Sequence, residues 1–236
     1  MILDTFSLHN LIVQVQYDSA YALWDRAGAI AMRLCKVWPT LEVKEGQPQQ
    51  QTLAGNGVQI QTGFSTSTVT IANAKAFDQR HVSQLSDTFE IWRDLLELKK
   101  LNRISTRAVF GKTFPSIKEA NDALLGLNLT AWPETKVFDQ PLDSGQNGLD
   151  IQYRFEDEKS FAVLRVRAEK LKIEVGLDPF FFDESSIEKE KNRLVIDFDR
   201  GLLGSIDVNS IRLDEWMKGF QHLLRRDIEK VLKVSR

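Results

Sequence analysis

The sequence predicts an α+β protein in which helices cover one face of an antiparallel sheet. Three segments alternate apolar and polar residues, at 149–155, 162–166 and 171–175, as strands do when one face is buried and the other is wet. Three longer segments, at 20–38, 79–99 and 213–233, place apolar residues at steps of three and four, which is typical of helices that pack on a core. The order of these elements also occurs twice along the chain.

The first half begins with a predicted strand at 11–16 and a helix whose core-facing stripe includes Trp24. Asp18 or Ser19 is expected to cap this helix, because side-chain oxygens accept the free N–H groups of a first turn. The helix is expected to end at Trp38, because Pro39 cannot donate a helical hydrogen bond. Further strands are predicted at 41–44, 58–64 and 66–71. The glutamine-rich segment 45–57 is predicted to be a loop, and a helix at 79–99 closes this half.

The second half repeats this order with a strand at 103–110 and a short helix. Ser116 and Glu119 have the spacing of a capping box at the start of that helix, and Gly126 is its expected end. The three alternating segments follow as a meander. The segment 178–192 is predicted to be a loop, and it leads to a strand at 193–199 and the final helix at 213–233.

Matching dipeptides suggest that the two halves derive from one plan. Trp38-Pro39 and Trp132-Pro133 are each followed, in the same order, by Gln-Pro, Asn-Gly and Ile-Gln. We therefore predict an internal duplication within one compact domain, with residues 1–101 as the first pseudo-repeat and 102–236 as the second. Trp38 and Trp132 should then occupy equivalent places. Independent use of common turn residues is the alternative explanation.

Two resemblances add to this interpretation. The order β-α-β-β-β(-β)-α in each half is similar to TATA-binding-protein-like folds, in which two such halves form a curved antiparallel sheet with helices on its convex side. The strands "RISTRAVF" and "LVIDFD" and the closing helix "LDEWMKGFQHLLRRDI" resemble a sporadically distributed family of uncharacterised bacterial proteins of about this length. That resemblance implies a bacterial origin and transfers no activity.

Composition excludes several kinds of site. The net charge is −2, from 31 basic and 33 acidic residues, which does not indicate a nucleic-acid-binding protein. One cysteine, Cys35, and three scattered histidines predict neither a disulfide nor a zinc site, and no phosphate-binding glycine loop occurs. We therefore predict no cofactor and no bound metal. Without a signal peptide or a long apolar run, the expected location is the cytoplasm, away from membranes.

Asp197 and Asp199 are the candidate catalytic residues. They lie two apart on a predicted strand, so that both carboxylates share a face and could hold magnesium or manganese with a third acid, Glu174 or Asp207. This pair is the basis of the alternative function, a metal-dependent phosphodiester or nucleotide enzyme. The other interpretation is a solvated strand face, or the start of a turn at 199–201.

Four arginines could form a basic strip. Arg103 and Arg107 share one strand face, Arg165 and Arg167 share another, and together they would suit a phosphate, a carboxylate or a nucleic acid. The flanking predicted strands contribute four acidic residues, namely Asp150, Glu156, Glu169 and Glu174. An ordinary mixed-charge face is therefore favoured over a nucleic-acid site.

Phe180, Phe181 and Phe182 are the candidate partner-binding residues. Three consecutive phenylalanines cannot all face one core, so they form either an apolar patch for a protein partner or a lid over the sheet edge. The function we expect is that of a non-catalytic protein-interaction module, or a subunit of a bacterial multi-component system. A role in antiviral defence would follow only from the family resemblance. A small ligand held between the sheet and the long helix is a third interpretation.

Overall fold

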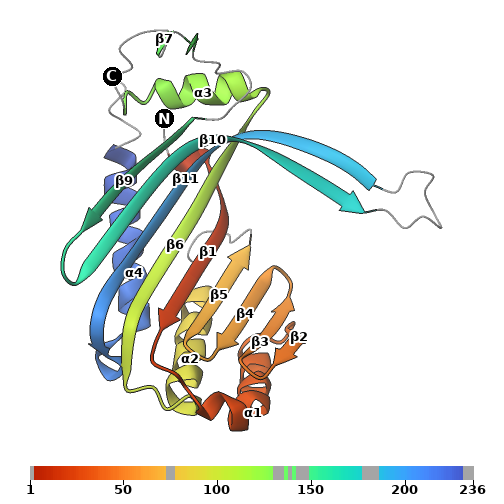
Figure 1. The fold of residues 1–236 in the computed structure, drawn as a ribbon, viewed down its shortest axis with the longest axis vertical. Coiled ribbons are helices and arrows are strands. Elements are labelled where there is room, and N and C mark those ends of the chain that lie inside the picture. The colour runs from red at the N-terminus through yellow and green to blue at the C-terminus, as the bar shows by residue number, and fades with distance from the viewer. Residues whose placement is uncertain are drawn as a thin grey trace.

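The structure is a computed structural model that describes residues 3–72, 78–129, 136–137, 140–141, 149–176 and 186–230. Nine strands form one open antiparallel sheet in the order β2-β3-β4-β5-β1-β6-β11-β10-β9 (Figure 1). The α+β class and the antiparallel sheet predicted from the sequence are thus confirmed. The strands are β1 (Ser7–Gln16), β2 (Glu42–Gln47), β3 (Gln50–Gly55), β4 (Val58–Gly63), β5 (Thr66–Ala72), β6 (Lys100–Phe114), β9 (Asp150–Glu156), β10 (Ser160–Gly176) and β11 (Ser186–Asp207), with a separate short pair β7 (Lys136–Val137) and β8 (Gln140–Pro141).

Three helices cover one face of this sheet, and no helix of the described residues covers the other face. They are α1 (Ala22–Val37), α2 (Gln79–Leu95) and α4 (Leu213–Leu223), the last continuing as a π-helical turn at Leu224–Ile228 (Figure 1). The fourth helix, α3 (Ile117–Leu125), packs across the end of β6, β10 and β11. The covering helices and the strands beneath them share one apolar core. Burial of this core is the main favourable contribution to folding.

Three tryptophans that lie in the core or pack against it each donate the indole N–H to a threonine hydroxyl. Trp38 donates to Thr88, Trp92 to Thr62, and Trp216 to Thr106, each over 2.9 Å. A buried indole needs such an acceptor, because an unpaired N–H away from water is costly. These contacts tie helices to the sheet at the Trp92 and Trp216 positions and tie the end of α1 to α2 at Trp38.

The start of α1 differs from the prediction. Tyr21 is the N-cap residue and no side chain caps the helix, while Asp18 instead accepts a hydrogen bond from Asn102 at 3.0 Å. Trp24 was expected in the core and is 58% exposed. The buried residues Leu23, Ile30 and Leu34 define the face of α1 that meets the sheet, and Trp24 lies beside that face against the rings of Tyr21 and Phe64.

Several boundaries also differ from the prediction. The expected loop at 45–57 contains the end of β2 and all of β3, in which Leu53 is fully buried within a mainly polar segment. The segments at 162–166 and 171–175 belong to one strand, β10, and β11 begins at Ser186 inside the expected loop. The start of α3 is as predicted, because Ser116 Oγ accepts the Glu119 N–H at 3.2 Å. The helix stop at Trp38 is also confirmed.

The hairpin of β10 and β11 extends beyond the rest of the sheet. The last pair between β11 and β6 is Asn192 with Phe114, and the last pair between β10 and β9 is Arg167 with Asp150. From Leu171 and Lys191 outward, six residue pairs join β10 and β11 alone. Figure 1 shows this part, which we call the ribbon, projecting from the body of the protein. At the usual rise of about 3.3 Å per residue it is about 20 Å long.

Two predictions concern residues that the structure does not describe. Trp132, which was expected to match Trp38, and Phe180, Phe181 and Phe182 lie outside the described residues. Within the described part of the chain, no helix has the length and apolar character needed to cross a membrane.

Candidate functional site

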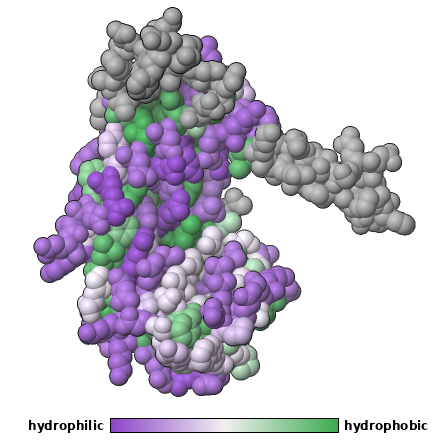
Figure 2. All heavy atoms as spheres, viewed as in Figure 1, coloured by the Kyte–Doolittle hydropathy of each residue, from purple (hydrophilic) through white to green (hydrophobic). Residues whose placement is uncertain are grey.

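The predicted site residues meet on the open face of the sheet. β6, β11 and β10 lie side by side, and the register pairs Asp199 with Arg107 and Asp197 with Arg165. Directly paired residues point to the same face of a sheet. Arg103, Arg107, Arg165, Arg167, Asp197 and Asp199 therefore all lie on the face opposite the helices. Hydrophilic residues cover much of this face in Figure 2.

Asp197 is the centre of a network of ion pairs. Arg107 donates from Nε to Oδ1 over 2.7 Å and from Nη2 to Oδ2 over 2.5 Å, and Arg167 Nη1 lies 3.3 Å from Oδ2. The Asp197 residue is only 3% exposed. Hydrogen bonding to Asp197 raises the pKa of Arg107 above its ordinary value. Two guanidinium groups thus compensate one buried carboxylate, as a buried charge requires.

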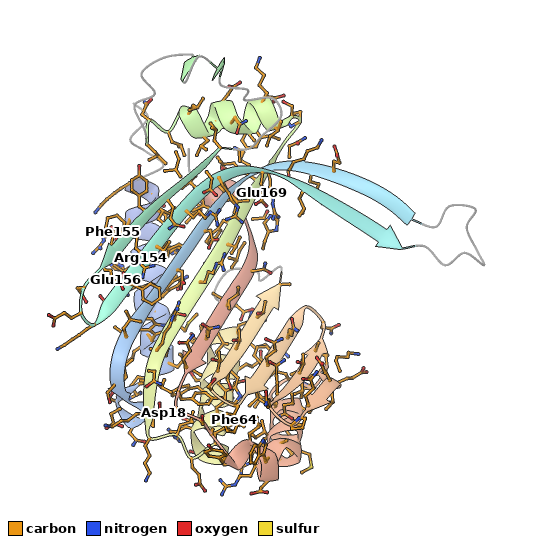
Figure 3. All side chains as sticks on the ribbon, viewed as in Figure 1. Asp18, Phe64, Arg154, Phe155, Glu156 and Glu169 are labelled. Atoms are coloured by element: carbon orange, nitrogen blue, oxygen red, sulfur yellow. The ribbon has the colours of Figure 1, made fainter. Side chains whose placement is uncertain are left out.

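The network continues through Glu169 to the place where the ribbon leaves the sheet (Figure 3). Arg167 Nε donates to Glu169 Oε2, and Arg193 Nε donates to Oε1, each over 2.6 Å. Burial alone would raise the pKa of Glu169, but hydrogen bonds from Arg167 and Arg193 outweigh it and lower this pKa. The chain Arg107–Asp197–Arg167–Glu169–Arg193 therefore joins three cations and two anions across three neighbouring strands.

Asp199 occupies a different environment from Asp197. Arg103 Nη2 lies 3.2 Å from Asp199 Oδ2, and the ring of Phe161 covers this guanidinium at 4.4 Å. Asp199 Oδ1 and Arg103 Nε are buried without a hydrogen-bond partner in the described structure. Burial raises the pKa of Asp199, although the neighbouring arginines oppose this. The absence of a Cβ at Gly201 makes room for the Phe161 ring, whose nearest atom would lie 2.4 Å from that Cβ.

The fourth predicted arginine is paired apart from this network. Arg165 donates to both carboxylate oxygens of Asp150 on the edge strand β9, at 2.8 and 2.9 Å from Nε. That hydrogen bonding lowers the pKa of Asp150. Arg154 and Glu156 form a further pair on β9 (Figure 3). The face therefore carries charges of both signs. This is the mixed-charge face that the acidic residues of the flanking strands favoured in the sequence.

The arrangement favours ion pairing over metal binding at Asp197. Both of its oxygens are occupied by guanidinium groups, and a hard cation would have to displace them. Asp207, a proposed third ligand, lies at the far end of β11, where the strand register places it opposite Lys100. Among the described residues, no group of three His, Cys, Asp or Glu side chains could hold a metal ion. An anion is chemically better suited to this face, because the chain from Arg107 to Arg193 has one more arginine than carboxylates.

Two members of the site were not singled out from the sequence. Arg193 and Phe161 each lie an even number of residues from a polar-face residue on the same strand, Asp197 and Arg165 respectively. That spacing places them on the open face and was a usable signal. Their contacts with Glu169 and Arg103 could not be inferred, because the contacts depend on strand register.

Comparison with protein-family models finds no match to this chain, and comparison with curated protein sequences finds none either. The functional interpretation therefore rests on the geometry of the molecule itself.

Proposed function

We propose that the protein is a non-catalytic protein-interaction module and that the ribbon of β10 and β11 is the part that engages the partner. The observation that carries this proposal is the ribbon's extension beyond every neighbouring strand. The proposal includes a cytoplasmic location. We also propose that the protein is a subunit of a bacterial multi-component system with a role in defence, and this part of the proposal rests on the family resemblance alone.

The ribbon has little stability of its own. A two-stranded ribbon without further strands or a covering helix is at best marginally stable in water. Each outer edge also carries backbone N–H and C=O groups that can pair with another strand. A partner that adds a strand to either edge would satisfy these groups and stabilise the ribbon, which is a common mode of peptide recognition.

The sequence of the ribbon supports the same proposal. Leu171, Ile173 and Val175 alternate with charged residues, and the register pairs Val175 with Ile187. Such β-branched and apolar residues favour an extended chain. The segment between the two strands contains Phe180, Phe181 and Phe182, which we propose as contacts to the partner. Aromatic residues are enriched at the centres of protein interfaces.

We further propose that the sheet arose by duplication and is TATA-binding-protein-like. In support, the first strand of each half, β1 or β6, lies at the centre of the sheet, and these two strands pair with each other. Outward from β1 come β5, β4 and β3, and outward from β6 come β11, β10 and β9. On each side, the strand next to the central strand is the last strand of that half, and strands farther out come progressively earlier in the chain.

The test is a variant in which an Asn-Gly turn replaces residues 171–191, so that the hairpin closes at Lys170 and Asn192. Asn-Gly suits a two-residue hairpin turn. Wild-type protein and this variant would be purified from the native host, and copurifying proteins would be compared by mass spectrometry and gel filtration. We expect the variant to keep its melting temperature and to lose a stoichiometric partner. A partner retained in full by the folded variant would overturn the proposal.

The wild type and a second variant test the alternative function. The metal-dependent enzyme predicts that magnesium or manganese raises the melting temperature of the wild type, and that the Asp197→Ala, Asp199→Ala double variant loses this response. If that pattern is found, the enzymatic interpretation replaces the present one. A partner lost with the ribbon and a melting temperature indifferent to both metals would favour the interaction module.

A further inference from the structure

An apolar hollow lies between the outer strands of the sheet and the C-terminal end of α4. Its volume is about 620 Å³. Leu164 and Phe198 contribute from the sheet and Leu223 and Ile228 from the helix and its π-helical turn. Small-molecule sites in proteins are commonly hollows of about 300–1,000 Å³ with mainly apolar walls. The hollow therefore has the size and lining of a ligand site.

Aromatic side chains of the edge strand β9 form the outer wall. The Tyr153 hydroxyl donates to the Leu129 carbonyl over 2.5 Å. This hydrogen bond fixes the orientation of the ring, which lines the hollow. Phe155, the next residue on this wall, is 62% exposed, and Figure 3 shows it on the outer edge of the sheet. A large exposed aromatic beside an apolar hollow is a surface that a ligand would cover.

The charged side chains at this hollow are unbalanced. The guanidinium of Arg200 lies over the Trp216 ring at 5.1 Å, and no carboxylate of the described residues is within salt-bridge distance of it. Burial lowers the pKa of Arg200, and the neighbouring charge of Arg226 lowers it further. Asp227 is shared between Arg226 and Lys230. The charged residues that line the hollow are thus two cations, Arg200 and Lys230, and one carboxylate, Asp227.

This arrangement is complementary to one kind of ligand. An amphiphile with a single negative charge would place its hydrocarbon chain against Leu164, Phe198 and Ile228 and would bring a carboxylate to the cationic rim. A carboxylate can accept two parallel hydrogen bonds from an arginine, which favours Arg200 over lysine as its partner. A neutral amphiphile would lack this contact, and a cationic one would be repelled.

We propose that the hollow between β9, β10, β11 and α4 binds an amphipathic carboxylate, with Arg200 as the residue that binds its head group. This site is distinct from the ribbon and does not depend on the proposed interaction function. Its occupant is a small molecule, of which a medium-chain fatty acid is the simplest example.

Three probes of equal chain length test the proposal, namely dodecanoate, dodecanol and dodecyltrimethylammonium. Binding to the full chain would be measured by isothermal titration calorimetry below the micelle concentration of each probe. We expect saturable binding of dodecanoate at one site, binding at least tenfold weaker for dodecanol, and weaker still for the cation. Absence of saturable dodecanoate binding, or equal binding of the cation, would overturn the proposal.

Two variants locate the site. Arg200→Gln removes the head-group contact, and Ala162→Phe fills the hollow from β10, where Ala162 is part of the lining. We expect each to weaken dodecanoate binding at least tenfold, whereas Arg80→Gln, an exposed arginine on α2, serves as the matched control and should bind as the wild type does. Circular dichroism would establish that each variant is folded. If either folded variant binds dodecanoate with wild-type affinity, the site is not this hollow.

Discussion

The guanidinium of Arg107 holds Asp197 with two parallel hydrogen bonds from the neighbouring strand, at 2.7 and 2.5 Å. The pairing is diagonal, because the register sets Asp197 beside Val109 and Arg107 beside Asp199. The two side chains also differ in exposure, at 4% for Asp197 and 44% for Arg107. The carboxylate is therefore part of the interior, and its charge is compensated from the solvent side.

Replacement of Arg107 should consequently destabilise the fold. Arg107→Gln leaves Asp197 buried with Arg167 alone, and the loss of one partner of a buried group costs about 1–3 kcal/mol. Urea unfolding would measure the change. Arg165→Gln is the matched control, because its partner Asp150 is 36% exposed and exposed pairs contribute about 0–1 kcal/mol. Equal losses in the two variants would contradict the central role assigned to Asp197.

Asp199 should make stability depend on pH in a defined direction. Its pKa is raised above 3.8 by burial, so between about pH 3.8 and the raised value the folded state holds more protons than the unfolded state. The contribution of Asp199 to the free energy of unfolding therefore falls as the pH rises through that window. Asn cannot ionise, so Asp199→Asn should gain stability relative to the wild type as the pH rises from near 4 to neutrality. A stability difference that does not vary with pH would show that burial leaves the pKa of Asp199 unchanged.

Gly201 should not accept a side chain. A Cβ there would lie 2.4 Å from the Phe161 ring and 2.6 Å from the Ile104 carbonyl oxygen, which is backbone and cannot turn aside. Gly201→Ala should therefore cost about 1–3 kcal/mol, as overpacking commonly does. Gly28→Ala is the opposite control, because nothing lies within 4 Å of a Cβ at this helical position, and it should stabilise by about 0.5–1 kcal/mol. Thermal unfolding would measure both changes, and a Gly201→Ala variant as stable as the wild type would contradict the close packing of Phe161 on Gly201.

Thr88 should be needed as a hydrogen-bond acceptor. Thr88→Val keeps the shape of the side chain but leaves the buried Trp38 indole N–H without a partner, at a cost of about 1–3 kcal/mol. The change would be measured by chemical denaturation. Thr68→Val on the open face removes only a 3.4 Å contact with Gln14 and should have a small effect. A similar loss in both variants would mean that the indole contact contributes nothing particular.

Local patterns in the sequence were sufficient for most elements of this fold. Alternation identified the strands around 11–16 and 149–155, and the three- and four-residue steps identified α1 and α2. The hairpin of β2 and β3 was predicted only at its start, as a strand at 41–44, because the rest of it is mainly polar and every residue of β2 is exposed. In β10 the alternation at 162–166 and 171–175 was recognised, but the continuity of the two segments in one strand was not. The start of β11 was missed because Ile187 is the one apolar residue in the sequence 186–192.

The candidate site was foreseen in its parts and not in its connections. The shared faces of Arg103 with Arg107 and of Asp197 with Asp199 followed from spacing alone. The pairing of Arg107 with Asp197 did not, because it depends on β6 and β11 being neighbours in a particular register. Nor did the difference between the two aspartates, because the environment of Asp199 is made by Phe161 and Arg103 on two other strands.

Strand β11 has a mechanical consequence. Its 22 residues run from the ribbon at Ser186 to Asp207, just before the turn that leads into α4. Along the way it is held by β6 on one side and β10 on the other. Ladder hydrogen bonds lie perpendicular to antiparallel strands, so a pull along β11 loads many of them in shear at the same time. A partner that pulls on the ribbon would therefore meet high mechanical resistance. The force would be transmitted along β11 past Asp197 and Arg200 into the body of the protein.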